Sequence, residues 1–255
     1  MSAMRSFLAT GLLAVFLVIG QARAQQTYPT TAPADDAGFE SIFDGKSLAG
    51  WEGDPKFWRF ENGAIVGEIT PGNEIKRNTF IIWRGGAGGG TLKDFELKLR
   101  YRISGKGNSG INYRSTEVQD TPFAMKGYQF DIDGGGKANA AEVRHTGNNY
   151  EERGRTFMAL RGQITRAVEG GKRQVIGSLG EYKDLMRFIR GGEDEWNDVH
   201  IIARGNTLVH ILNGQVMSIL VDDDPANRTA EGKLGVQVHT GPPMKVEFRD
   251  IRLKR

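Results

Sequence analysis

The sequence predicts an all-β fold in which antiparallel strands form a sandwich or a barrel. From Gly38 onward, short apolar or alternating runs are separated by glycine-rich turns, and the chain contains 35 glycines. One run alternates over nine residues, and an Asn213-Gly214 pair between two apolar runs is a strong hairpin signal. Helical patterns are scarce. Strand after strand at this spacing is typical of sandwiches and barrels.

The clearest strand runs from Phe95 to Ile103, with the sequence FELKLRYRI. Apolar residues alternate there with Glu, Lys and Arg, so one face of the strand must be buried. After the loop SGKGNSG, a second strand begins at Ile111, and the stretch from Gly127 to Gly136, GYQFDIDGGG, begins with a third. We therefore expect three sequential strands in the middle of the chain.

The remaining elements are predicted to be short strands and one helix. The helix covers Glu181 to Arg190, where apolar residues recur at three- and four-residue spacing and a Gly-Gly pair follows. The segment 138–154 is polar and is predicted to be a loop. Further strands are expected at 156–168, 174–176, 199–203, 208–212, 215–221, 233–239 and 246–253.

The first 24 residues are predicted to be a secretory signal peptide. Arg5 precedes a short apolar run, and Ala22-Arg23-Ala24 is a small-x-small cleavage signal. The run is shorter than the roughly 20 residues of a spanning helix, so no membrane anchor is expected after cleavage. Residues 25–37 are predicted to be a flexible spacer and residues 38–255 a single domain. We expect an exported protein, in the periplasm or outside the cell.

Charge and cysteine content narrow the class of protein further. The formal charge is +3, and it falls to +1 when the signal peptide is removed, because two arginines and no acids are lost. No block of basic residues remains, so a nucleic-acid partner is not expected. The chain has no cysteine, so the folded domain must be held by its core without disulfides.

The strand after Gly127 carries two different faces. Alternation places Tyr128, Phe130 and Ile132 on one face, and Gln129, Asp131 and Asp133 on the other. The first face is suited to a core. Two carboxylates and an amide in line are unusual for a face that is merely solvated, so we predict a functional site on the second face.

Two other strands carry polar residues at the same two-residue spacing. Asn112 and Arg114 alternate with Ile111 and Tyr113, while Gln237 and His239 alternate with valines. We expect all these polar side chains to emerge on one shared wall with Gln129, Asp131 and Asp133.

Six phrases of the chain occur in the order typical of one known family: FDGKSLAGW, GNSGINYR, GYQFDID, GNNYEERGR, EWNDVHIIARG and GVQVHTGPPMKVEFRDIRLK. Together they span nearly all of the predicted mature chain, which resembles the 3-keto-disaccharide hydrolase family. The resemblance implies a concanavalin-like jelly roll of two antiparallel sheets, with a sugar site on the concave one. It also implies a substrate already oxidised to a ketone at C3 by a separate oxidoreductase, a sugar 3-dehydrogenase.

For such a substrate, the resemblance implies elimination by removal of the C2 proton, followed by addition of water. The reaction needs a base at C2, a group that stabilises the enolate oxygen, and an acid at the leaving oxygen. The predicted base is Asp131 or Asp133, the predicted enolate stabilisers are Arg114 and Asn112, and the predicted acid is His239. Substrate-binding roles are expected for Asn112, Gln129, Gln237, Glu142 and His145.

A metal site is a further expectation in the same region. From Asp131 to Glu142 the chain has the calcium-loop pattern of carboxylates at positions one and three, Gly at six and Glu at twelve. Gly135 lacks the ligand of position five, and a strand precedes the loop where a helix should. A divalent ion, Ca²⁺ or Mn²⁺, would be held by Asp131, Asp133, Glu142 and His145.

Two other functions use the same residues. A non-catalytic carbohydrate-binding module would carry the same amides and guanidinium groups. An ordinary retaining glycosidase would use Asp131 and Asp133 as a carboxylate pair, since alternate strand residues lie about 6.8 Å apart and retaining pairs roughly 5 to 5.5 Å.

Overall fold

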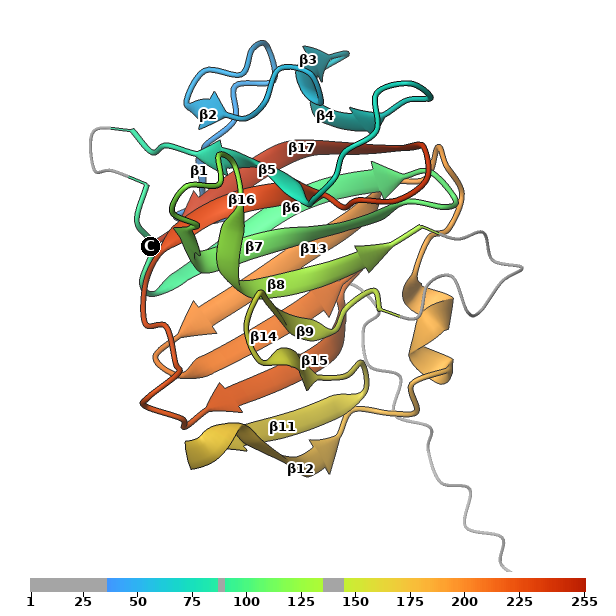
Figure 1. Ribbon diagram of the computed structural model, residues 1–255. Coiled ribbons are helices and arrows are strands. Elements are labelled where there is room, and N and C mark those ends of the chain that lie inside the picture. Colours follow the sequence, from blue (N-terminus) through green and yellow to red (C-terminus); the bar gives the residue numbers. More distant parts are fainter. Residues whose placement is uncertain (1–35, 87–89, 135–144) are drawn as a thin grey trace, which may run out of the picture. The chain divides into compact units, whose positions relative to one another are not determined.

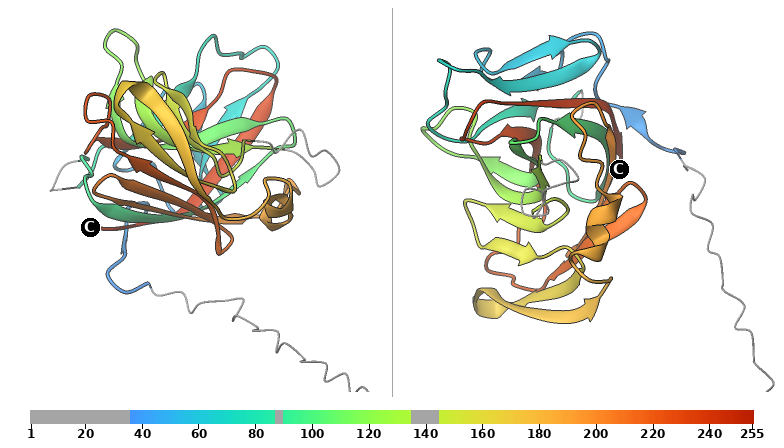
Figure 2. Two further views of the ribbon diagram at one scale, coloured as in Figure 1. Left: turned by 90° about the horizontal axis from the view of Figure 1, so that it is seen from below. Right: turned by 90° about the vertical axis from the view of Figure 1, so that its right-hand side faces the viewer.

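Two stacked β-sheets build the fold, as a computed structural model shows for residues 36–86, 90–134 and 145–255 (Figure 1). The predicted signal peptide, most of the spacer and Glu142 lie outside these described residues. The predicted two-sheet antiparallel jelly-roll sandwich is confirmed. In the side view of Figure 2, the yellow-green strands and the orange strands form separate layers.

The large sheet has ten strands in the order β12-β11-β15-β14-β13-β6-β17-β4-β3, with β1 paired to β17. Its strands are β1 (Glu40–Ser41), β3 (Trp58–Glu61), β4 (Ala64–Ile69), β6 (Phe95–Ile103), β11 (Gln163–Val168), β12 (Lys172–Ser178), β13 (Asn197–Arg204), β14 (Thr207–Leu212), β15 (Gln215–Asp222) and β17 (Met244–Lys254). The pairing of β11 with β15 is parallel, and the other pairings are antiparallel.

The small sheet has seven strands in the order β10-β9-β8-β7-β16-β5-β2. Its strands are β2 (Trp51–Glu52), β5 (Thr79–Trp83), β7 (Asn108–Glu117), β8 (Met125–Asp133), β9 (Asn149–Glu152), β10 (Thr156–Ala159) and β16 (Lys233–Val238). This sheet places the three strands of the predicted site side by side, because β7 lies between β8 and β16.

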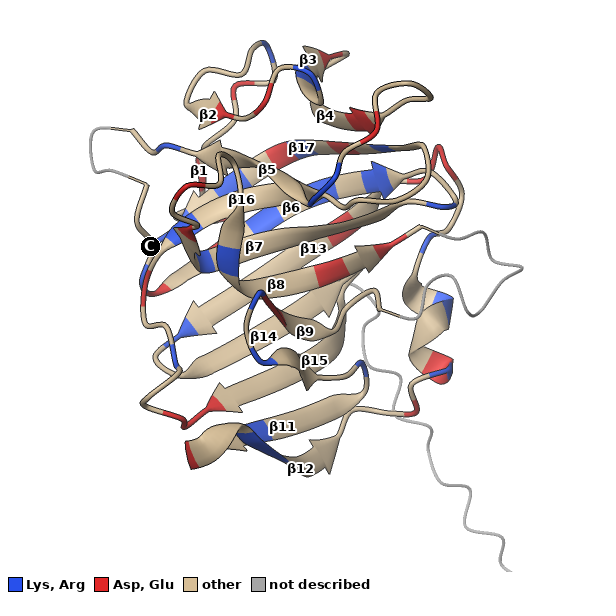
Figure 3. Ribbon diagram, in the orientation of Figure 1, with Lys and Arg blue, Asp and Glu red and all other residues tan. Residues whose placement is uncertain are grey.

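The core lies between the two sheets and follows the predicted alternation. In β6, every second residue from Phe95 to Ile103 is buried, while Glu96, Lys98, Arg100 and Arg102 between them are partly exposed. The colours along β6 in Figure 3 mark its charged residues. The small sheet contributes Ile111, Tyr113, Tyr128, Phe130 and Ile132 to the same core. Burial of these side chains stabilises the fold by roughly 1.5–3 kcal/mol each.

Three sequence-based expectations are wrong in detail. The predicted helix at 181–190 is only a 3₁₀-helix, η2 (Asp184–Phe188), because Ile189 is extended and Arg190 is tied to Asn197 of β13. Contact with the sheet therefore overrides the helical pattern. The run 156–168 is not one strand but two, β10 and β11. A second 3₁₀-helix, η1 (Glu169–Gly171), precedes β12.

Gly162 explains the break between β10 and β11. Its φ is +90°, a conformation that favours glycine, and a Cβ there would lie 2.4 Å from the carbonyl oxygen of Gly180. The predicted loop at 138–154 is also corrected in part, because its residues 149–152 form β9.

Candidate functional site

The polar face of β8 lies on the side of the small sheet that is turned away from the core. Gln129 and Asp131 are nearly inaccessible there, and the Gln129 amide Nε2 donates to Asp131 Oδ1 at 2.6 Å. Gly110 of the neighbouring strand β7 makes room for this bond. A Cβ at Gly110 would lie 2.3 Å from Gln129 Cδ, so a larger residue would displace the amide.

A pocket of about 130 Å³ opens above these two residues. It is smaller than the roughly 300 Å³ of typical enclosed ligand sites, so it can receive one edge of a sugar but cannot enclose a disaccharide. The lining combines carboxylates, amides, histidines and aromatic rings from four strands and their connections: Asn108, Gln129, Asp131, His145, Tyr150, Glu152, Phe157 and His239.

Asp131 is a carboxyl group of this pocket whose pKa is changed by its surroundings. Burial raises its pKa well above the usual range, because a charged carboxylate loses its water there. The Gln129 hydrogen bond opposes this by lowering the pKa, and the negative charges of Asp133 and Glu152 add to the increase. A carboxyl group with a raised pKa can act as an acid and, once ionised, as a strengthened base.

Replacing the donor at position 129 should change the Asp131 titration. In Gln129→Leu, the hydrogen bond that favours the charged carboxylate is lost, so we expect the pKa of Asp131 to rise further. Carboxyl ¹³C NMR against pH measures this shift. Gln237→Leu is the matched control, because Gln237 Nε2 contacts Gln129 Oε1. An unchanged Asp131 titration in Gln129→Leu would contradict the proposed influence of that bond.

Asp133 has a different environment from Asp131. Its carboxylate accepts hydrogen bonds from Asn108 Nδ2 at 2.9 Å and from the His145 backbone N–H at 2.8 Å, and its Oδ2 lies 3.0 Å from His145 Nδ1. Asp133 is not among the residues that line the pocket. It holds two residues that line the pocket, Asn108 and His145.

Two histidines line the pocket, His145 and His239. His239 follows β16, and its Nδ1 lies 2.6 Å from the Thr240 carbonyl oxygen. The neutral ring therefore carries its proton on Nδ1 and leaves Nε2 as an acceptor. The His145 ring stacks on Phe157, with 5.2 Å between centroids.

Gln237 and Asn112 are not among the residues that line the pocket. Both side chains are fully buried, and Gln237 donates to Gln129 while Asn112 Nδ2 lies 3.4 Å from Ser115 Oγ. The Oδ1 of Asn112 and the Oε1 of Gln237 have no hydrogen-bond partner among the described residues. Of the two, Gln237 holds a residue that lines the pocket, Gln129.

Arg114 does not share the wall, and this prediction is corrected. A bulge after Tyr113 shifts the register of β7, and Arg114 has a φ of +44°. Its buried guanidinium donates to the carbonyl oxygens of Lys93 and Gly205, each at 2.7 Å, and to Asp94. Arg114 thus stabilises connections of the large sheet and is not placed to stabilise an enolate in the pocket.

Four lining residues were not predicted: Asn108, Tyr150, Glu152 and Phe157. Glu152 is nearly buried and accepts a hydrogen bond from Asn78 Nδ2 at 3.0 Å. The signal was present in the phrase GNNYEERGR, where Tyr150 and Glu152 stand two apart, as residues on one strand face do. Assigning that phrase to a loop hid the alternation.

The metal expectation falls partly outside the described residues, because Glu142 is one of its four ligands. Among the residues of 36–86, 90–134 and 145–255, no group of three or more His, Cys, Asp or Glu side chains is arranged to hold a metal ion.

Fold and site together define a β-sandwich domain with a polar, carboxylate-bearing pocket of the kind that carbohydrate-active proteins use. The chain belongs to the family described as the 3-keto-alpha-glucoside-1,2-lyase-like domain, whose profile matches residues 38–254. A 3-keto-disaccharide hydrolase of Bacteroides thetaiotaomicron is 35% identical over 96 residues. That alignment covers 34% of this chain and 30% of the relative, so it spans about a third of either protein.

Solved structures share the fold. Two Parabacteroides distasonis proteins described as candidate glycosyl hydrolases superpose with TM-scores of 0.54, at 17% and 21% identity. They cover 85% and 88% of this chain, and 98% of each of those chains is matched. A Bacillus subtilis protein with a galectin-like fold has a TM-score of 0.52 at 11% identity, over 81% of this chain and 90% of that chain.

Proposed function

We propose that the protein is an exported enzyme that cleaves the glycosidic bond of 3-keto-disaccharides and related 3-keto-glycosides. The observation that carries this proposal is Asp131, a buried carboxyl group with a raised pKa at the floor of a polar pocket. Membership of a 3-keto-glucoside lyase-like family supports the substrate class. The name of the Bacteroides relative supports net hydrolysis.

The ketone makes the chemistry accessible to a carboxylate. A carbonyl at C3 acidifies the hydrogen on C2, so ionised Asp131 takes that proton and the electron pair forms a C2–C3 enolate. When the enolate collapses, a C1–C2 double bond forms, the C1–O bond breaks, and the leaving oxygen takes a proton from an acid. Water then adds its hydroxyl to C1 and a proton to C2, which completes the hydrolysis.

The remaining roles follow from the lining of the pocket. Protonated His239 can supply the proton of the leaving oxygen through Nε2, since Nδ1 faces the Thr240 carbonyl. In place of Arg114, the Asn108 amide and the Tyr150 hydroxyl are the donors for the enolate oxygen. The raised pKa of Asp131 suits a base, because its ionised carboxylate binds a proton more strongly than that of an ordinary aspartate.

The decisive test is a comparison of a 3-keto-disaccharide with its unoxidised parent. We expect release of the second sugar from the oxidised substrate and none above background from the parent, with and without a chelator. Equal rates on both would contradict the elimination. Loss of activity in the presence of chelator would indicate that the reaction requires a metal ion.

Ordinary glycoside hydrolysis is the second candidate, and one observation favours it. Asp131 and Glu152 are two carboxyl groups in one pocket, and the pKa of Asp131 is raised, which is the environment of a general acid in glycosidases. The parent disaccharide in the same assay distinguishes the two reactions. Binding of a polysaccharide without any product from either sugar would instead favour a non-catalytic module.

Export and an upstream partner are parts of the same proposal. The predicted signal peptide, 1–24, supports export, and no helix in the described part of the chain is long and apolar enough to cross a membrane. We expect N-terminal sequencing of the exported, purified protein to show that the mature chain begins at Gln25. The substrate class requires an oxidoreductase that converts the C3 hydroxyl to a ketone before this enzyme acts.

A further inference from the structure

The β9–β10 hairpin forms one wall of the pocket and is the edge of the small sheet. Tyr150, Glu152 and Phe157 of this hairpin line the pocket. The opposite face of β9 carries Asn149 and Glu151, which point toward the large sheet and are buried. The inner face of this wall is therefore polar where most inner faces of the sandwich are apolar.

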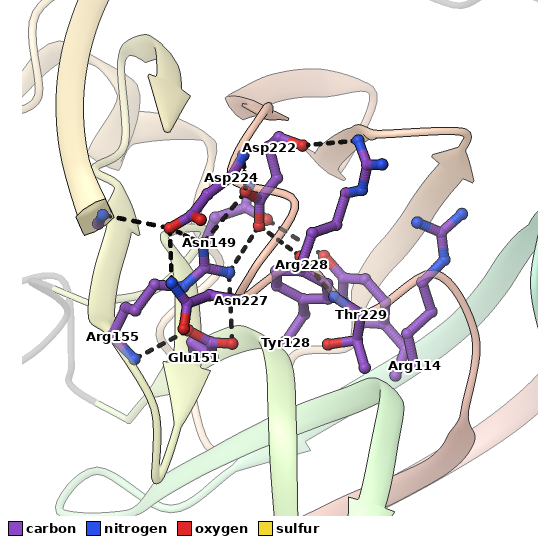
Figure 4. Close-up of polar contacts among 12 residues, drawn as sticks. Arg114, Tyr128, Asn149, Glu151, Arg155, Asp222, Asp224, Asn227, Arg228 and Thr229 are labelled. Carbon is purple, nitrogen blue, oxygen red and sulfur yellow. Dashed lines mark hydrogen bonds and ion pairs between the residues drawn. The ribbon is translucent and has the colours of Figure 1, made fainter. Parts of the chain in front are cut away.

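Directional polar contacts join this inner face to β15 of the large sheet (Figure 4). Arg155 donates to Asp222 at 2.6 and 3.1 Å and to Glu151 at 2.6 Å, and Asp222 also accepts a 2.5 Å bond from the Tyr128 hydroxyl. We call Glu151, Arg155, Asp222 and Tyr128 the Arg155 network. Asn149 adds a separate link, since its Nδ2 donates to Ser218 of β15 at 3.0 Å.

The turn of the hairpin needs such support. Arg153 and Thr156 have φ values of +55° and +67°, a left-handed conformation that non-glycine residues rarely adopt. Strained turns persist where surrounding contacts fix them. Glu151 accepts from both the backbone N–H and the side chain of Arg155, so the network closes this turn directly.

We propose that Arg155 is a positioning residue that fixes the β9–β10 hairpin against the large sheet, so that Tyr150, Glu152 and Phe157 keep the width of the pocket. A guanidinium bonded to two carboxylates from different sheets allows little sliding, because its donors lie in a rigid plane. The catalytic consequence rests on the function proposed above. The structural consequence does not.

Arg155→Met is the test variant, and Arg102→Met is the matched control. Arg102 also forms a two-bond ion pair with a nearly buried partner, Glu247, but on the outer face of the large sheet. We expect Arg155→Met to raise KM for a 3-keto-disaccharide about tenfold with a much smaller change in kcat, because Asp131 stays on β8. Arg102→Met should change neither constant.

A second variant distinguishes the positioning role of Arg155 from its contribution to stability. Arg155→Met leaves Asp222 buried without its cation, so the double variant Arg155→Met/Asp222→Asn should recover much of the lost melting temperature. We expect KM to remain raised in the double variant, because the neutral pair still lacks the guanidinium that joins Glu151 to Asp222. A KM that returns to the wild-type value together with stability would overturn the proposal.

Hydrogen exchange tests whether Arg155 fixes the β9–β10 hairpin, and this test needs no enzyme activity. We expect faster amide exchange confined to 149–159 in Arg155→Met, and no such local change in Arg102→Met. Exchange that rises uniformly over both sheets, or not at all in the hairpin, would overturn the positioning role. If the wild-type protein cleaves no 3-keto-disaccharide, the proposed function fails, while the exchange comparison still tests Arg155.

Discussion

Asp131→Asn is expected to lower kcat on a 3-keto-disaccharide by about 10²- to 10⁴-fold, the usual contribution of a general base. Asparagine keeps the shape of the side chain and cannot accept the C2 proton. The rate of product release, with C2-deuterated and unlabelled substrate, measures the loss and shows whether proton abstraction limits turnover. A fully active Asn variant would place the base elsewhere, and Glu152 would be the next residue to replace.

The same variant has an expected effect on stability. A raised pKa in the folded state means that Asp131 stabilises the fold at pH values below the 3.8 of an ordinary Asp, and that this contribution is lost as pH rises through the raised pKa. Asparagine at position 131 does not ionise, so the variant does not lose stability in this way as pH rises. We therefore expect the variant to be at least as stable as the wild type near neutral pH in thermal unfolding.

Asp133→Asn is the matched control for chemistry, because it removes a carboxylate from the same strand outside the pocket lining. Its charge and acceptor capacity hold Asn108 and His145. We expect a reduced melting temperature and a smaller loss of turnover than in Asp131→Asn. The reverse order of the two losses would assign the base to Asp133.

Arg114→Met is expected to lower the free energy of unfolding by about 2–4 kcal/mol, because the carbonyl oxygens of Lys93 and Gly205 lose their charged donor. The loss is limited because burial lowers the pKa of Arg114, so holding this charge inside the protein is itself costly. Denaturant unfolding measures the change. Activity per folded molecule should stay within about twofold of the wild type, since Arg114 lies away from the pocket.

A different outcome would restore the original expectation for Arg114. If Arg114→Met keeps its stability and loses turnover, the guanidinium acts on the substrate in a conformation that differs from the one described. Arg102→Met again provides the comparison, as the loss of an arginine from the same fold at a site far from the enolate.

The sequence predicted the sheets well because alternation reports burial directly. In β6 each apolar residue is buried and each charged one is not, and the Asn213-Gly214 turn joins β14 to β15 as expected. The same reasoning failed at residues 181–190, where helical spacing is overruled by the hydrogen bonds between Arg190 and Asn197. Spacing describes a local preference and contains no information on such contacts.

The site was predictable only where strands are regular. Gln129 and Asp131 follow strict alternation along β8, and the sequence places them on one face. Arg114 departs from it because one bulge reverses the side on which the following residue emerges. No residue pattern in GNSGINYR marks that bulge. Glu152 was missed because its phrase was assigned to a loop, and Phe157 was missed because the sequence does not show that β10 pairs with β9.

The hydrogen bond between Gln129 and Asp131 has a stereochemical consequence. Because Gln237 donates to one end of the Gln129 amide and the other end occupies Asp131 Oδ1, Oδ2 is the oxygen left for the substrate. A base that works through a single oxygen on a fixed floor meets a sugar ring from one side. Epimers at C2 present their hydrogen on opposite sides, so this geometry would separate a gluco-configured ring from its manno counterpart.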